Sequence, residues 1–294
     1  MVAKAQIVVP VHQLDRPIRR AIDSVLRCAD ADVIVVAHGL DADVLSLPDD
    51  PRIQVVNVPD GVGFPGVAFN AGVRAATAQW VGIMGSDDWF EVGALESMLS
   101  RLDQDSADGV LAPLRHDTKA TNDLNPVTWR QKNLRARQDR MFYRTAPLGL
   151  YRREILQDAR YSFDESTHSG EDAVMSARLW SNQKHLSYYW DDPAYVVGSD
   201  AGSRVTTVQR PLREHVPAWE TMWAKDTLAF LTAQEKVDLA NKMFQVNVLP
   251  LLQSRPRPSD WIEDDFEWLS RIVIRMKQVA PGFERSFTRS NRRV

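Results

Sequence analysis

Short apolar segments alternate with helical segments through roughly the first ninety residues, and this alternation restricts the fold more than any other feature of the sequence. Apolar runs at 6–11, 33–36, 53–58 and 80–84 predict four strands, and the first is apolar on both faces, as in the middle of a parallel sheet. Apolar residues at helical spacing in 17–26, and a run of small residues in 67–78, predict two helices, the second able to pack closely on the sheet. This order of elements predicts a doubly wound α/β fold.

The sequence is less regular beyond these elements and changes character near residue 210. Strands are predicted at 110–114, 186–190 and 195–197, a strand with a turn at 142–152, and an amphipathic helix at 171–181. Strand patterns cease after Pro211, and residues 214–252 and 261–279 are predicted to be helical. We therefore expect a domain of residues 1–210, followed by a C-terminal helical region of residues 211–294 that ends in a basic tail.

Composition limits the class of protein. The 294 residues are 44% hydrophobic and carry a net charge of −3, which is typical of a soluble globular protein and argues against nucleic-acid binding. The single cysteine, Cys28, fits a reducing compartment. The sequence contains no apolar stretch long enough to be a transmembrane helix, and no signal peptide is recognised at its start. We expect a cytoplasmic protein, with peripheral contact to the inner face of the membrane as a further option.

The fourth predicted strand ends abruptly at Gly85-Ser86-Asp87-Asp88. In open α/β sheets, ligands bind at the carboxyl ends of the strands. Adjacent carboxylates repel each other unless a cation neutralises them, and Mg²⁺ or Mn²⁺ prefers oxygen ligands that it often shares with phosphates. The turn therefore predicts a metal–diphosphate site. The alternative is structural, because either aspartate could cap a helix that begins near Glu91.

Three other groups of polar residues fall at comparable positions. Val11 ends the first predicted strand and His12 follows it, whereas His38 and Asp41 follow the second. Glu171 and Asp172 open the helix predicted at 171–181. A carboxylate at a helix start is ordinarily structural, because the helix dipole favours it.

Several segments, taken in order, resemble a known family. They are the strand and helix at 7–11 and 20–26, an Asn-x-Gly helix at 69–77, the acidic turn at 86–89, and a segment from Phe163 to Asp172. Together they resemble glycosyltransferase family 2, over residues 5–207. The resemblance implies the GT-A fold, a Rossmann-like, mixed and mainly parallel sheet flanked by helices, here with a C-terminal helical appendage.

The resemblance also implies an activity and the residues that perform it. A sugar would pass from a nucleoside-diphosphate sugar, with inversion, to a hydroxyl of a glycan, lipid-linked or cell-envelope polymer acceptor. Asp172 is the implied general base, and Glu171 would bind the acceptor or orient Asp172. The implied ligands of a Mn²⁺ or Mg²⁺ ion are Asp87, Asp88 and Asp200. The residues expected to contact the donor, a UDP-sugar, are Pro10, Val11, His12, His38, Asn70, Ser86 and Asp87.

The chain departs from the family pattern at several of these positions. Ala37 and His38 stand where many members carry two aspartates, so His38 would have to contact the nucleotide base. Gly85 replaces the first aspartate of the metal-binding triplet, which leaves Asp87 as the main carboxylate for the cation. Asp200 aligns where the family often has a histidine ligand, and its alternative is a simple turn residue.

Two other functions remain open on the sequence. A catalytically impaired relative that binds a sugar or a partner is favoured by Ala37 and Gly85, and disfavoured by the retained Asp87, Asp88 and Asp172. A sugar nucleotidyltransferase would need a glycine-rich phosphate loop after the first strand, where this chain has Val11-His12-Gln13-Leu14. The C-terminal helices could bind a membrane-linked or polymeric acceptor, mediate self-association, or simply cover the edge of the sheet.

Overall fold

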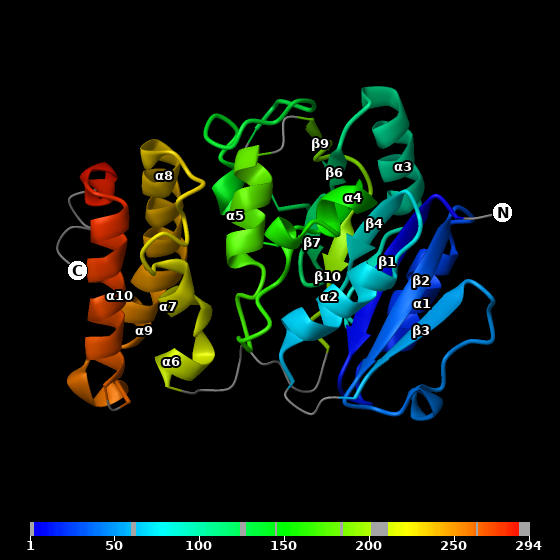
Figure 1. Ribbon diagram of the computed structural model, residues 1–294, viewed down its shortest axis with the longest axis horizontal. Helices are drawn as coiled ribbons and strands as arrows, with labels where there is room; N and C mark the ends of the chain where they lie inside the picture. The colour runs from blue at the N-terminus through cyan, green and yellow to red at the C-terminus, as the bar shows by residue number, and fades with distance from the viewer. Residues whose placement is uncertain are drawn as a thin grey trace.

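The structure, a computed structural model, describes residues 3–59, 63–123, 128–144, 146–182, 185–200, 211–262 and 264–287. A seven-stranded mixed sheet lies at its centre, in the order β3-β2-β1-β4-β8-β6-β9 (Figure 1). The strands are β1 (Ala5–Val11), β2 (Ala31–His38), β3 (Ile53–Val58), β4 (Trp80–Ile83), β6 (Gly109–Leu111), β8 (Gly149–Arg152) and β9 (Leu186–Tyr188). Strands β1 to β4 pair in parallel, and β8 runs antiparallel to both β4 and β6.

Both faces of the sheet are covered by helices, which explains why β1 and β2 are apolar throughout. Successive residues of a strand point to opposite faces. Ile7 and Val9 accordingly belong to the hydrophobic cluster beneath α1 (Ile18–Leu26) and α3 (Ala94–Asp105). Val8 belongs to the opposite cluster, with α2 (Pro65–Ala75) and α5 (Ala173–Asn182). The predicted α/β architecture is confirmed.

A small second sheet is absent from the sequence-based prediction. It consists of β5 (Trp89–Phe90), β10 (Tyr195–Val197) and β7 (Leu114–His116), in that order. The single strand predicted at 110–114 is wrong, because the chain leaves the main sheet after β6 and enters the second sheet at β7. Pro113 lies between the two and has no N–H group to continue a ladder.

Two other element predictions are corrected. Residues 142–152 form a strand only at β8, since Met141–Tyr143 is a 3₁₀ turn. The helix predicted over 214–252 is broken after α7. Thr232 and Glu235 form a capping box that starts a new helix.

The C-terminal helices are α6 (Leu212–His215), α7 (Ala218–Met222), α8 (Ala233–Met243), α9 (Leu249–Ser254) and α10 (Asp265–Val279). The remaining short elements are α4 (Arg153–Leu156) and 3₁₀ turns at Ala42–Leu45, Ala159–Tyr161, Pro258–Asp260 and Phe283–Ser286.

A π-helical segment, Phe244–Val248, joins α8 to α9. Pro250 follows in the first turn of α9. In a continuous α-helix, Pro250 would have no N–H group to donate to the carbonyl of Val246, and the proline ring would collide with that carbonyl. We attribute the π turn to this proline, because a π-helix pairs residues five apart rather than four.

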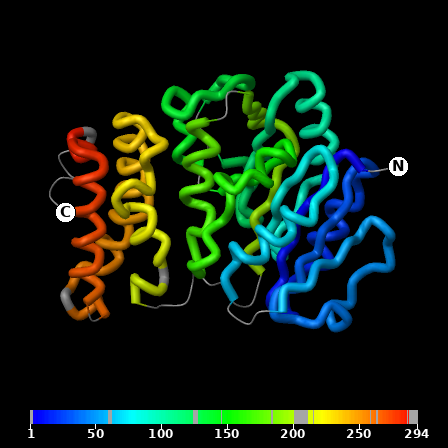
Figure 2. Tube along the Cα trace, viewed as in Figure 1, coloured from blue at the N-terminus to red at the C-terminus, as the bar shows by residue number. Residues whose placement is uncertain are grey.

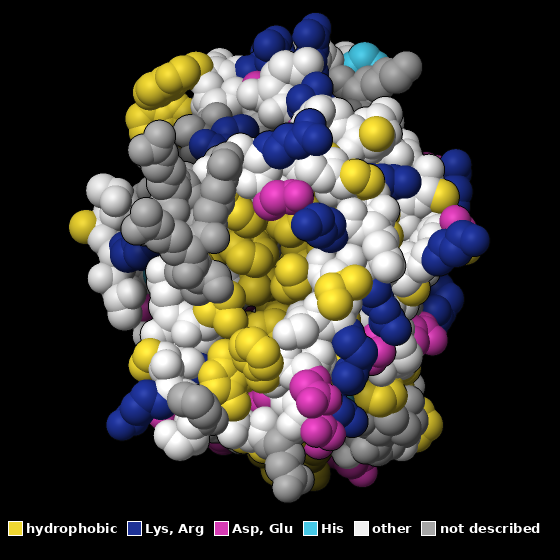
Figure 3. All heavy atoms as spheres, turned by 90° about the vertical axis from the view of Figure 1, so that its left-hand side faces the viewer, with side chains coloured by type: hydrophobic (Ala, Val, Ile, Leu, Met, Phe, Trp, Pro, Cys, Tyr) yellow, Lys and Arg dark blue, Asp and Glu magenta, His cyan; other side chains and the backbone are white. Residues whose placement is uncertain are grey.

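The C-terminal helices lie side by side at one end of the molecule, next to α5 (Figure 2). Their buried side chains belong to the same hydrophobic cluster as α2 and α5. Hydrophobic side chains also gather on the outer face at this end (Figure 3). Among the described residues, no helix combines the length and the apolar character needed to cross a bilayer. The predicted boundary at 210 and the basic tail after Phe287 lie outside the described residues.

Candidate functional site

The carboxyl ends of β1, β2 and β4 meet at one edge of the sheet and bring three predicted donor residues together. His12 follows β1, His38 ends β2, and Asp87 lies four residues after β4. Partial burial, followed by the positive charge of Arg16, lowers the pKa of His12, which also feels His38 and Asp87. This edge therefore combines imidazole and carboxylate groups, as the sequence predicted. Two further predicted donor residues, Val11 and Ser86, have buried side chains, and Pro10 precedes Val11 in β1.

Asp88 ties the acidic turn to the second sheet. One of its carboxylate oxygens accepts a hydrogen bond from the hydroxyl of Tyr195, and the other accepts from the backbone N–H of Gly198 at 2.9 Å. The same Tyr195 hydroxyl accepts from the N–H of Gly85 at 3.0 Å. Burial and the negative charge of Asp88 raise the pKa of Tyr195, which keeps its hydroxyl a donor. Asp88 therefore has a structural role in this turn, and both its oxygens are used.

The glycine at position 85 is a consequence of this arrangement. A Cβ atom at Gly85 would lie 2.7 Å from a carboxylate oxygen of Asp88 and 3.1 Å from one of Asp87. A larger residue here would require the carboxylate of Asp88 to shift and would crowd that of Asp87. Gly198 directly follows β10. A Cβ atom at this position would lie 2.0 Å from the carbonyl oxygen of Asp87, so a larger residue would not fit without a shift of the backbone.

Two arginines near the start of α1 hold the other carboxylates. Arg16 donates to Asp87 at 2.7 Å, in an ion pair whose side chains are 9% and 17% exposed. Arg20 donates to both carboxylate oxygens of Asp200, at 2.7 and 2.9 Å, and to the backbone carbonyl of Asp87 at 2.5 Å. The guanidinium groups thus place two positive charges beside the turn. The sequence analysis did not identify either arginine, although their four-residue spacing at the start of a helix places them on one side.

The helix-cap alternative for the acidic turn is wrong. Helix α3 begins at Ala94, its cap is Gly93, and no side chain caps it. The described residues hold no group of three or more His, Cys, Asp or Glu side chains arranged to bind a metal ion. One carboxylate oxygen of Asp87 makes no hydrogen bond among these residues, whereas the oxygens of Asp88 and Asp200 accept from the groups named above. The turn fits a cation shared with a bound diphosphate, because Mg²⁺ is often held by one or two carboxylates and substrate phosphates.

Asn70 fastens α2 to the segment that precedes the second acidic pair. Its amide nitrogen donates to the carbonyl of Phe163 and to the carboxylate of Glu165, each at 2.9 Å. Its amide oxygen accepts from the N–H of Phe163 at 2.9 Å. The side chain is buried and its polar atoms are used within the protein. Its predicted role in donor binding stays a prediction.

Glu171 and Asp172 lie together at the start of α5. The loop before them is closed by a bond from the N–H of Asp164 to the carbonyl of Glu171 at 2.8 Å. Burial raises the pKa of both carboxyl groups, and the negative charge of Asp172 raises that of Glu171 further. A carboxylate with a raised pKa is a stronger base than an exposed one, which suits proton abstraction.

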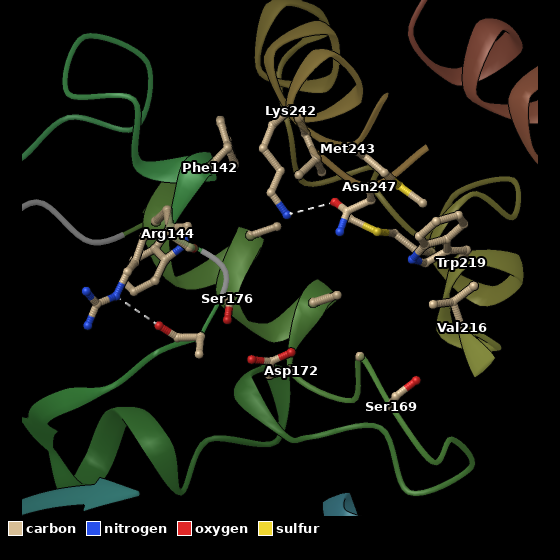
Figure 4. Close-up of a pocket in the computed structure, with 17 residues that line it drawn as sticks. Phe142, Arg144, Ser169, Asp172, Ser176, Val216, Trp219, Lys242, Met243 and Asn247 are labelled. Carbon is tan, nitrogen blue, oxygen red and sulfur yellow. Dashed lines mark hydrogen bonds between the residues drawn. The ribbon is translucent and has the colours of Figure 1, made fainter. Parts of the chain in front are cut away.

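Asp172 lines a cavity of about 440 Å³ between α5 and the C-terminal helices (Figure 4). The walls include the aromatic side chains of Phe142, Trp180 and Trp219, and Lys242 faces the cavity from α8. A cavity of this size is typical of small-molecule sites. Nothing local in the sequence points to Lys242 or to the cavity, because the lining residues from the C-terminal helices lie far along the chain from Asp172.

The mainly parallel sheet with helices on both faces, and the acidic turn at its carboxyl edge, define the GT-A class of folds. The chain belongs to glycosyl transferase family 2, whose model matches residues 6–160. The resemblance inferred from the sequence is thereby confirmed.

Curated relatives include ExoO of Rhizobium meliloti, a succinoglycan biosynthesis protein that is 28% identical over 190 residues, covering 58% of this chain and 53% of ExoO. TarS of Staphylococcus aureus, a poly(ribitol-phosphate) beta-N-acetylglucosaminyltransferase, is 19% identical over 212 residues, covering 69% of this chain and 37% of TarS. The chain therefore spans about half the length of ExoO and less of TarS.

Among solved structures, S. aureus TarS 1-349 in complex with UDP-GlcNAc superposes with a TM-score of 0.78 at 18% identity, covering 95% of this chain and 82% of that one. The mannosyltransferase PcManGT from Pyrobaculum calidifontis, in complex with GDP-Man and Mn²⁺, gives 0.51 at 13% identity, covering 94% and 86%. At these identities the likeness shows the fold alone.

Proposed function

We propose that this protein transfers a sugar from a nucleoside-diphosphate sugar to an acceptor hydroxyl, with inversion at the anomeric carbon. The observation that carries the proposal is the position of Asp172, a carboxylate with a raised pKa that lines a cavity large enough for a small ligand. Family membership supports transferase chemistry. TarS bound to UDP-GlcNAc supports a UDP-sugar as the expected donor.

The reaction needs one base and no protein nucleophile. The acceptor hydroxyl loses its proton to Asp172 as its oxygen attacks the anomeric carbon, and the bond to the diphosphate breaks on the opposite face. Glu171, which has the more strongly raised pKa, stays protonated beside Asp172 and can donate a hydrogen bond to the acceptor or to that carboxylate.

The departing diphosphate gains negative charge that must be stabilised. Arg16 and Arg20 supply positive charge at the acidic turn. Where Mn²⁺ or Mg²⁺ binds, Asp87 would hold it together with diphosphate oxygens, and the cation would act as a Lewis acid. His12 and His38, at the ends of β1 and β2, would contact the nucleotide.

The role of Asp172 is tested by Asp172→Asn. We expect this variant to bind UDP-GlcNAc, used as the probe donor, with the wild-type affinity in calorimetry, and to transfer no sugar. In the wild type, transfer should decline as the pH falls through the raised pKa of Asp172, because the protonated acid cannot accept a proton. Turnover of Asp172→Asn within about tenfold of wild type would refute the assignment, since general-base catalysis is worth about 10²- to 10⁴-fold.

The role of Asp87 is tested on donor binding. We expect Asp87→Asn to abolish Mn²⁺-dependent binding of UDP, measured by calorimetry with and without the cation. The matched control is Asp158→Asn, which alters a partly exposed carboxylate that is paired with Arg160 away from the acidic turn and should leave this binding unchanged. Unchanged Mn²⁺-dependent binding in Asp87→Asn would remove Asp87 from the site.

The acceptor and the association with a second copy are further parts of the proposal, and both concern the C-terminal region. We propose a glycan, lipid-linked or cell-envelope polymer acceptor, and association of a second copy through the exposed hydrophobic face of the C-terminal helices (Figure 3). Phe266 and Ile274 of α10 are 59% and 56% exposed and lie on one side of that helix. Sedimentation velocity should detect a dimer, and a monomer at all concentrations would contradict self-association.

A further inference from the structure

Lys242 is a buried cation that forms no ion pair with a carboxylate in the described part of the chain, although the charge of Asp172 acts on it across the cavity. The residue is 7% exposed, and its ammonium group donates to the side-chain oxygen of Asn247 at 3.3 Å. Burying a charge without a partner is costly, and the group usually responds by shifting its pKa. Burial lowers the pKa of Lys242 to about 8, and the negative charge of Asp172 offsets this only in part.

A second polar group in the same cavity has no hydrogen-bond partner among the described residues. The hydroxyl of Ser176 is buried and makes no hydrogen bond in the described structure. It lies on α5, one turn after Asp172, and lines the cavity (Figure 4). Buried polar groups in native proteins are nearly always satisfied, so an orphaned hydroxyl in a cavity indicates a missing ligand or water. Lys242 and Ser176 both face the space that Asp172 lines.

The π turn contributes to the same wall. Asn247 lies in this turn, five residues after Lys242, and the two side chains meet at the cavity. Such turns are frequent at functional sites. The remaining wall is largely aromatic and apolar, with Trp180 and Trp219, which suits the carbon face of a polyol or sugar.

We propose that this cavity receives the acceptor, and that Lys242 binds an anionic group, a phosphate or a carboxylate, which the acceptor carries close to its reactive hydroxyl. Ser176 and Asn247 supply neutral hydrogen-bonding groups beside it. Lys242 is thus a specificity-determining residue, which selects charged over neutral acceptors. The inference rests on the proposed function, in which Asp172 accepts the proton of that hydroxyl.

The first test measures binding of small probes. Titration with glycerol 3-phosphate, glucuronate and uncharged glycerol would be followed by tryptophan fluorescence, since Trp180 and Trp219 line the cavity. We expect saturable binding of at least one anionic probe and none of glycerol. Lys242→Met should weaken anion binding about tenfold or more. Lys236 lies on the same helix but does not line the cavity, so Lys236→Met should leave anion binding unchanged.

The relative response of the two anions identifies the source of the charge. Preference for glycerol 3-phosphate indicates a phosphate-bearing acceptor, and preference for glucuronate a uronic acid, and either supports the inference. Wild-type affinity in Lys242→Met, or equal binding of glycerol, would overturn it. Competition by UDP would also overturn it, because the cavity would then belong to the donor diphosphate.

A pH series separates charge recognition from packing. The other titratable groups that face the cavity are Asp172, with Glu171 beside it, and Arg144, whose guanidinium donates to the backbone carbonyls of Ala112 and Leu148. As the pH rises through about 8, Lys242 loses its proton, so anion binding should fall. Lys242→Arg stays charged and should show a smaller fall, because only the deprotonation of Glu171, whose pKa is raised to about 8, then remains. Identical pH profiles in the two proteins would contradict the assignment.

The two levels of the proposal fail in different ways. If the wild type binds the anionic probe through Lys242 but does not bind UDP-GlcNAc or UDP, the transferase proposal fails and the anion site stands. If UDP-GlcNAc binds and Asp172→Asn alone loses transfer, while Lys242→Met binds the anions normally, the anion site fails and the proposed function stands.

Discussion

At the scale of the residue, the contact between Asp88 and Tyr195 decides the shape of the acidic turn. Asparagine at position 88 would keep one acceptor oxygen, but its amide nitrogen could not accept from Tyr195 or Gly198. We expect Asp88→Asn to lower the free energy of unfolding by about 1–3 kcal/mol, because either the hydroxyl of Tyr195 or the N–H of Gly198 loses its acceptor. Urea denaturation would measure the change.

Asp200→Asn is the control for this prediction. Asp200 lies in a half-exposed ion pair with Arg20, and such pairs contribute about 0–1 kcal/mol. Equal destabilisation by the two substitutions would mean that Asp88 is not the structural member of the acidic cluster.

The sequence could locate the acidic turn but could not distinguish the two aspartates. Both follow β4, and both are carboxylates that a cation could use. Their difference depends on Tyr195, which lies 107 residues from Asp88 along the chain. For the same reason Arg16, whose partner Asp87 is 71 residues away, had no local signal that tied it to the site.

At the scale of the element, α2 sits unusually close to the sheet. A Cβ atom at Gly72 would lie 2.2 Å from the side chain of Val8 in β1 and 2.9 Å from that of Val36 in β2. The small-residue run predicted to pack closely on the sheet does so. The helix begins with Pro65 in its first turn, where a missing N–H costs nothing.

We expect Gly72→Ala to destabilise the protein, despite the better helix propensity of alanine, because overpacking a core typically costs about 1–3 kcal/mol. Thermal denaturation followed by circular dichroism would measure it. Arg74→Ala, on the exposed side of the same helix, should change the midpoint little. An increase in stability from Gly72→Ala would show that α2 can move away from β1.

Helices and strands were predicted well where the residues of one short segment are enough to define the element. The strands at 53–58 and 195–197 agree with the structure, because each is an apolar run bounded by turn residues. The helix predicted over 214–252 failed, because helical spacing continues through a stretch where Asp226 adopts a positive φ and the chain turns. Periodicity alone does not report such a reversal.

At the scale of the whole molecule, the C-terminal region is part of the main core. Helix α8 is joined to the preceding part of the chain by an ion pair between Arg137 and Asp238 and by a hydrogen bond from Ser181 to Glu235. Arg178 of α5 lies over the ring of Phe230, at 3.9 Å. The hydrophobic cluster beneath these contacts contains residues from both regions.

A fragment of residues 1–210 should therefore be less stable than the full chain. Removing α6 to α10 exposes the apolar side of α5, so we expect a lower thermal midpoint and increased binding of the dye ANS. Removal of residues 288–294 alone keeps every described contact and serves as the control. A fragment as stable as the full chain would establish residues 1–210 as an independent domain.

The π turn between α8 and α9 has a consequence for how this chain tolerates changes in length. Each residue of an α-helix advances the helix by about 100°. The π turn holds about one residue more than an α-helical turn, so removing one residue from 244–248 would shorten the turn while α9 keeps nearly its orientation. The contact between Lys242 and Asn247 would be lost, because residues five apart do not share one face of an α-helix. A one-residue deletion there would therefore change the wall of the cavity without displacing α9.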